Sequence, residues 1–144
     1  MHTTMQTTQR PTAAFVGASW GALLIGASAY LIGLWNAQMQ LNEKGYYLTL
    51  LLYGLFAAVS LQKTVRDRSE GLQVTNMYVG LCWISLLAAI LLLTVGLWNA
   101  TLAPSEKGFY AMSFTLSLFA VVAVQKNVRD LASLKDVEPK AEIA

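Results

Sequence analysis

The chain has 144 residues, of which 56% are hydrophobic and only 12% are charged, with a formal net charge of +2. This composition is poorly matched to a soluble globular domain. The chain has one cysteine, Cys82, and one histidine, His2. That count rules out an intrachain disulfide and a self-contained zinc, haem or Cys–His catalytic site, so we expect no metal and no cofactor.

Residues 1–12 are polar and rich in Thr and Gln, which is typical of a disordered tail. The next segment, 13–35, is uncharged and apolar, and its apolar run is longer than that of a signal peptide. We therefore expect a retained transmembrane helix. It carries a stripe of small residues at helical spacing, which predicts a tight helix contact within the chain or between chains. This small-residue stripe consists of Ala18, Ala22, Gly26, Ala29 and Gly33.

Three further apolar segments follow, at about 43–64, 76–98 and 106–128. Each has the length of about 20 residues that a bilayer core requires, and none alternates in polarity as a barrel strand would. The sequence therefore predicts an all-α membrane protein with four transmembrane helices. The segment 68–75 is expected to be a linker, and 131–144 a charged tail.

The chain is an internal repeat with a period of 63 residues, so that 13–67 and 76–130 are two copies of one two-helix unit. Gly33-Leu34-Trp35-Asn36-Ala37 recurs as Gly96-Leu97-Trp98-Asn99-Ala100, and Glu43-Lys44-Gly45 recurs as Glu106-Lys107-Gly108. Gln62-Lys63-Thr64-Val65-Arg66-Asp67 recurs as Gln125-Lys126-Asn127-Val128-Arg129-Asp130. Because each unit has two spans, both copies have the same orientation, and we expect two parallel helical hairpins.

The basic residues are distributed unevenly over the two membrane faces. Eight lie in the amino-terminal tail, the central linker region or the carboxyl-terminal region, against two in the turns within the repeats. The eight are Arg10, Lys63, Arg66, Arg68, Lys126, Arg129, Lys135 and Lys140, and the two are Lys44 and Lys107. The positive-inside rule then predicts that both termini, the linker and the tails are cytoplasmic.

The repeated turn phrase has a structural interpretation for nearly every residue. Tryptophan is an interfacial anchor, Asn36 and Asn99 suit a helix end in the left-handed conformation, and Asn42 and Ser105 are favoured N-cap residues. The functional hypothesis is that the two turns form one paired binding surface on the periplasmic face. Its candidate residues are Trp35, Asn36, Glu43, Lys44, Tyr47, Trp98, Asn99, Glu106, Lys107 and Tyr110.

The basic ends of the repeats also have two interpretations. Lys63 and Arg66 share a helix face, as do Lys126 and Arg129, because each pair is three residues apart. Such a face can contact anionic cytoplasmic lipids, and the alternative is a docking site for a cytoplasmic partner.

The centres of the four spans contain no Asp, Glu, Lys, Arg or His. Proton-coupled transporters generally need an ionisable residue there. The sequence also lacks a nucleophile–base pair and any phosphate-binding phrase, so we expect neither an enzyme nor a nucleic-acid partner. The alternative is a small transporter or channel formed between protomers. Its pathway would be lined by Tyr30, Tyr53, Ser85 and Thr94.

The doubled phrases GLWNA, EKG and QKxVRD resemble the YiaA/YiaB inner-membrane protein family, and the match covers about residues 13–131. The family is built on a two-helix domain, and this chain is most similar to the members that carry two copies. The resemblance implies a bacterial inner-membrane protein and no catalytic residue. We therefore expect a multi-pass, non-enzymatic accessory or structural membrane protein. It would act through self-association into a homo-oligomer, contact with membrane lipids, or a partner complex.

Overall fold

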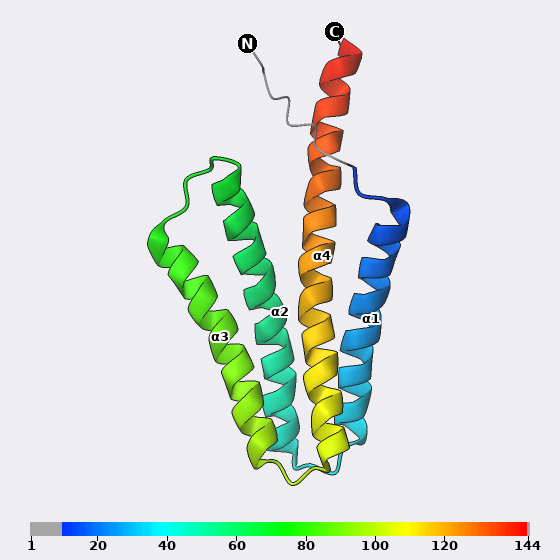
Figure 1. Cartoon of the computed structure of the whole chain (residues 1–144), viewed down its shortest axis with the longest axis vertical. Coiled ribbons are helices and arrows are strands. Elements are labelled where there is room, and N and C mark those ends of the chain that lie inside the picture. Colours follow the sequence, from blue (N-terminus) through cyan, green and yellow to red (C-terminus); the bar gives the residue numbers. More distant parts are fainter. Residues whose placement is uncertain (1–9, 144) are drawn as a thin grey trace.

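Figure 1 shows the computed structural model, which describes residues 10–143 and the side chains of residues 10–136. Its four helices are α1 (Ala13–Asn36), α2 (Leu41–Ser69), α3 (Asn76–Asn99) and α4 (Pro104–Ile143). Each of the four is long and apolar enough to cross a membrane, and the described residues contain no strand. The predicted all-α, four-span fold is therefore confirmed. Of the expected amino-terminal tail, 1–12, residues 1–9 lie outside the described residues.

Two helices continue beyond the predicted spans, to Ser69 in α2 and to Ile143 in α4. Charged residues four positions apart support a helix outside the apolar region. Lys63 pairs in this way with Asp67, and Lys126 pairs with Asp130. The basic phrase of each repeat is thus helical, near the end of α2 and well inside α4.

The helix ends differ in detail from the expected ones. The cap of α2 is Gln40, one residue before Leu41, and α4 begins at Pro104, so Asn42 and Ser105 are not N-caps. Proline suits a first helical turn because its missing N–H would have no partner there. The helix-ending asparagines are also not left-handed, since Gly71 alone has a positive φ among residues 10–143. Instead their amides donate to the carbonyl oxygens four residues earlier, at 2.9 Å.

The two repeats interlock. Helix α1 packs along α4, α3 packs along α2, and α2 and α4 lie against each other in the middle. The two helices of one repeat contact each other little, and Figure 1 shows α4 between α1 and α2. Each helical hairpin is therefore open, and the other repeat supplies its main packing partner. The bundle has a tail end, with both termini and the α2–α3 connection, and a turn end, with the α1–α2 and α3–α4 turns.

Close approach between the repeats depends on small residues. A Cβ atom on Gly26 of α1 would meet Ser117 Oγ of α4 at 2.7 Å, and one on Gly54 of α2 would meet the Phe114 ring of α4 at 2.7 Å. Gly33 likewise faces the ring of Phe109. Both glycines of the small-residue stripe thus pack against α4 of the same chain. Of the stripe's alanines, Ala22 and Ala29 are half-buried and Ala18 is exposed.

Candidate functional site

At the tail end, the two repeats exchange ion pairs. Arg66 of α2 pairs with Asp130 of α4, and Arg129 of α4 pairs with Asp67 of α2 at 2.5 Å. The two pairs are related by the period of the repeat, because the Arg–Asp dipeptide occurs once in each copy. Each arginine therefore finds its carboxylate on the other repeat. These two ion pairs, Arg66–Asp130 and Arg129–Asp67, are together called the crossed pair. They join the two central helices where the helices leave the apolar region.

Glu70, at the end of α2, connects the two arginines. It accepts from Arg66 Nε at 2.9 Å and from Arg129 Nη2 at 2.8 Å. These two hydrogen bonds hold the pKa of Glu70 below its ordinary value. The equivalent residue of the second repeat is Ser133, whose hydroxyl donates to a backbone carbonyl. The tail-end ion network therefore follows the repeat except at this one carboxylate.

The four basic residues of this network were predicted as contact residues from the sequence, but its acidic residues were not. Lys63 and Lys126 keep more than half of their side chains exposed, while Arg66 and Arg129 are largely covered. The lysines therefore remain available to lipid or to a partner, and the arginines bind carboxylates within the chain. Asp67, Glu70 and Asp130 were missed, although a parallel repeat places two Arg–Asp dipeptides side by side and so carried the signal.

Just below the network, each repeat contributes one buried polar contact to the other. Asn127 of α4 donates to Ser19 Oγ of α1 at 3.2 Å, and Thr64 Oγ1 of α2 lies 3.7 Å from Cys82 Sγ of α3. These pairs occupy equivalent positions, so the same contact is built from different residues. Asn127 Oδ1 is buried and has no hydrogen-bond partner among the described residues.

At the turn end, the structure divides the predicted periplasmic surface into two pockets. One has a volume of about 780 Å³ and combines Asn36 of the first repeat with Glu106 and Tyr110 of the second. The other has a volume of about 400 Å³ and combines Asn99 with Glu43 and Tyr47. Each pocket thus joins the end of one repeat's first helix to the start of the other repeat's second helix.

The remaining residues of the predicted surface lie outside these pockets. Trp35 and Trp98 are both 83% exposed, which suits side chains that meet the membrane interface. The ammonium groups of Lys44 and Lys107 donate to the carbonyl oxygens of the two tryptophans, at 3.1 and 3.5 Å. These lysines therefore close the turn of their own repeat, and they do not join the asparagine and glutamate across repeats.

An aromatic cluster lies next to the turn-end pockets, inside the bundle. Tyr30 of α1 is fully buried, and its hydroxyl donates to the carbonyl of Tyr47 at 2.7 Å. Tyr110 and Phe114 of α4 pack against the Tyr30 ring. These side chains fill the middle of the bundle where α1, α2 and α4 meet.

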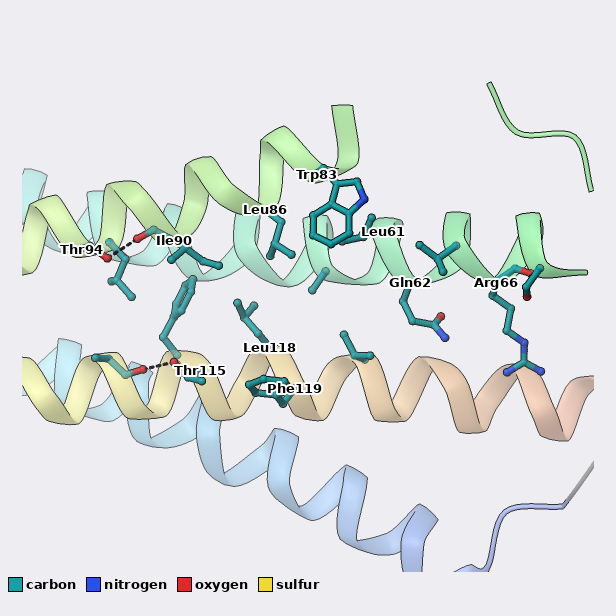
Figure 2. A pocket seen from close by; sticks show the side chains of 17 residues that line it. Leu61, Gln62, Arg66, Trp83, Leu86, Ile90, Thr94, Thr115, Leu118 and Phe119 are labelled. Carbon is teal, nitrogen blue, oxygen red and sulfur yellow. Dashed lines mark hydrogen bonds between the residues drawn. The ribbon is translucent and has the colours of Figure 1, made fainter. Parts of the chain in front are cut away.

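A third cavity opens at the side of the bundle. It is a groove of about 640 Å³ with α2 as its floor and α3 and α4 as its walls. Figure 2 shows Trp83, Leu86 and Ile90 on one wall, and Gln62 and Arg66 toward one end. The groove is lined mostly by apolar side chains. No cluster of His, Cys, Asp or Glu suited to a metal ion occurs among the described residues.

The family model described as the yiaA/B two helix domain matches the chain twice, over residues 15–67 and 78–130. The chain belongs to the YiaAB family. The predicted resemblance and the duplicated two-helix domain are thereby confirmed.

Two proteins of Escherichia coli K12 and one of Bacillus subtilis 168 are similar to this chain. The inner membrane protein YiaA is 59% identical over 117 residues, which are 81% of each chain. The inner membrane protein YiaB is 32% identical over 96 residues, 67% of this chain and 81% of the relative. The uncharacterized membrane protein YubF is 36% identical over 63 residues, 43% of this chain and 72% of the relative. No solved structure matches.

The relatives and the four apolar helices together identify a multi-pass inner-membrane protein. In this chain, the crossed arginine–aspartate pairs and the paired turn-end pockets all lie between the two YiaAB domains. The duplicated phrase therefore specifies contacts between copies as well as the ends of helices.

Proposed function

We propose that this YiaAB protein is a non-enzymatic accessory protein of the inner membrane. It acts by contact, in the plane of the bilayer, with lipids, a second copy of itself or a partner protein. The supporting observation is the position of the apolar groove, which opens between α3 and α4 rather than along the bundle axis. The middle of the bundle is instead occupied by Tyr30, Leu51 and Phe114. A cavity at the side suits a ligand that arrives from the bilayer.

The transport alternative receives less support. Of the four side chains expected to line a pathway, Thr94 lines the groove, and its hydroxyl donates to the carbonyl of Ile90 at 2.8 Å. Tyr30 is fully buried in the aromatic cluster. Tyr53 and Ser85 do not line the groove. These four residues therefore do not form one polar surface within a protomer.

Reconstitution tests the proposal directly. Full-length protein in phospholipid vesicles is expected to leave an imposed pH gradient as long-lived as it is in empty vesicles. Native mass spectrometry of gently extracted protein is expected to show bound lipid, a second copy or a co-purifying chain. Faster loss of the pH gradient on addition of a solute would contradict an accessory role, and so would a lipid-free monomer.

We also propose that the tail end faces the cytoplasm. Among the described side chains, seven basic residues lie at the tail end and two at the turn end, which the positive-inside rule associates with a cytoplasmic tail end. The seven are Arg10, Lys63, Arg66, Arg68, Lys126, Arg129 and Lys135, and the two are Lys44 and Lys107.

Labelling with a membrane-impermeant maleimide tests this orientation. In a Cys82→Ser background, Gln38→Cys at the turn end is expected to react in intact spheroplasts. Gln73→Cys at the tail end is expected to react only after permeabilisation. The reverse pattern would show that the tail end is external.

A further inference from the structure

The groove between α3 and α4 has the shape and chemistry of a lipid site. We propose that it binds one acyl chain of an anionic glycerophospholipid from the leaflet at the tail end, with the phosphate beside Arg66. This inference rests on the proposed accessory function and specifies its ligand. The groove's length, its lining and the charge at its end each support it.

The groove extends over most of the thickness of the membrane. It begins at Ala111 of α4 and reaches Arg66 of α2, which lies level with the equivalent Arg129 of α4. From residue 111 to residue 129, α4 rises about 27 Å at 1.5 Å per residue. The hydrocarbon core of a bilayer is about 30 Å thick, so one leaflet contributes about 15 Å. An acyl chain that enters from the tail-end leaflet therefore fits within the groove over the whole depth of that leaflet.

The walls of the groove are apolar in a way that suits an acyl chain. Leu86 and Ile90 of α3 face Leu118 and Phe119 of α4 across the gap (Figure 2). The hydroxyl groups of the two threonines in the groove do not require a polar ligand. Thr94 and Thr115 donate their hydroxyl hydrogens to carbonyl oxygens of their own helices, both at 2.8 Å.

Polar groups are gathered at the tail end of the groove, where a headgroup would lie. Gln62, Arg66 and Ser69 line this part. Gln62 Oε1 is buried without a hydrogen-bond partner among the described residues, so its amide is not committed to the protein. Arg66 uses Nε and Nη2 for Glu70 and Asp130, and its Nη1 has no hydrogen-bond partner in that part of the chain. This nitrogen is a donor for a phosphate oxygen.

The charge around this end favours an anion. The tail-end parts of α2 and α4 carry five basic and three acidic side chains, an excess of two positive charges, and of these only Arg66 lines the groove. The basic residues are Lys63, Arg66, Arg68, Lys126 and Arg129, and the acidic ones are Asp67, Glu70 and Asp130. Basic side chains at a membrane surface attract anionic lipids. A phospholipid whose acyl chain lies in the apolar groove therefore has its charged headgroup at the basic end.

The repeat supplies a matched control for the groove. Trp83 lines it, whereas the equivalent Trp20 belongs to α1 on the other side of the bundle, and the two rings are 48% and 46% exposed. Two proteins that each retain one of these tryptophans, with the other three changed to Phe, would be placed in vesicles of phosphatidylethanolamine and phosphatidylglycerol. Brominated phosphatidylglycerol or brominated phosphatidylcholine then quenches whichever tryptophan it contacts.

We expect Trp83 to be quenched more strongly by brominated phosphatidylglycerol than by brominated phosphatidylcholine, and Trp20 to be quenched equally by both. Equal ratios at the two tryptophans would overturn the site. If neither brominated lipid quenches Trp83 in a crosslinked dimer, a second copy occupies the groove, and the lipid site is also overturned. Solute-driven loss of a pH gradient would contradict the proposed function without changing these ratios.

Two pairs of variants locate the headgroup and the acyl chain. Arg66→Gln is expected to lower the phosphatidylglycerol preference at Trp83 about fivefold, the effect of one basic contact. Arg129→Gln breaks the equivalent ion pair away from the groove and should retain the preference. Thr115→Phe fills the groove and should abolish it, while the equivalent Leu52→Phe should not. Loss of the preference in both members of a pair would overturn the assignment.

Discussion

The tail end and the turn end are built from the same repeated phrases, yet their polar groups are used differently. At the tail end, Arg66 and Arg129 are paired with carboxylates of the opposite repeat. At the turn end, Glu43 and Glu106 take no part in an ion pair among the described residues and line open pockets. Duplication of a phrase therefore does not by itself make a functional site. One end uses its charges to hold the repeats together, and the other leaves them for a ligand or solvent.

The largest expected effect comes from breaking the crossed pair. Asp130→Ala leaves Arg66 and Lys126 without their shared carboxylate, which is 5% exposed, and should lower the free energy of unfolding by about 3 kcal/mol. Denaturant titration in micelles, followed by circular dichroism, measures this. The charge exchange Arg66→Asp with Asp130→Arg should recover part of the loss. A loss below about 0.5 kcal/mol would show that the network does not hold the repeats together.

A smaller effect is expected for the one buried polar contact of the aromatic cluster. Tyr30→Phe removes the hydrogen bond to the carbonyl of Tyr47 and keeps the ring packing, so unfolding should become easier by about 1 kcal/mol. The same titration measures it, with Tyr53→Phe as an exposed control. An equal change in the two variants would mean that the hydrogen bond contributes nothing.

Acidification should weaken the tail end selectively. The folded-state pKa of Glu70 is lowered from 4.5, so its stabilising contribution is present above that value and is lost as the pH falls through the lowered pKa. The thermal midpoints of the parent and Glu70→Gln should therefore differ at pH 7 and converge in strong acid. A constant difference over the whole range would exclude ionisation of Glu70 as the cause.

The smallest effect is expected at the turn end. Glu43→Gln and Glu106→Gln alter exposed carboxylates without ion pairs among the described residues, and each should change the unfolding free energy by less than about 0.5 kcal/mol. A loss comparable to that of Asp130→Ala would remove the contrast between the two ends. A stability increase in the presence of a small amine or phospholipid headgroup would instead identify a ligand for the pockets.

The sequence predicts the elements of this fold better than their arrangement. Uncharged segments of sufficient length define the four spans, and the period of the repeat gives the parallel relation. The choice of packing partner was not predictable, because helices that are apolar on all sides carry no face that points to one neighbour. Gly26 and Gly33 indicate close contact but do not say that α4 supplies it.

The residues of the candidate site were also easier to predict than their arrangement. Asn36, Glu106 and their equivalents were predicted as a surface, but their grouping across repeats depends on the interlocked arrangement. The groove was not predicted at all. One of its lining residues is Leu93, whose equivalent in the first repeat is the larger, fully buried Tyr30. The difference between Leu93 and Tyr30 can be interpreted only when the helices around each side chain are known.

The interlocking of the repeats also sets an order of assembly. Chains are synthesised from the amino terminus, so α1 enters the membrane first, while its packing partner α4 is completed last. The faces of α1 at Gly26 and Gly33 therefore remain in contact with lipid until translation of the second repeat ends. The first half of this protein is inserted long before it is folded, and the last helix to arrive completes both halves.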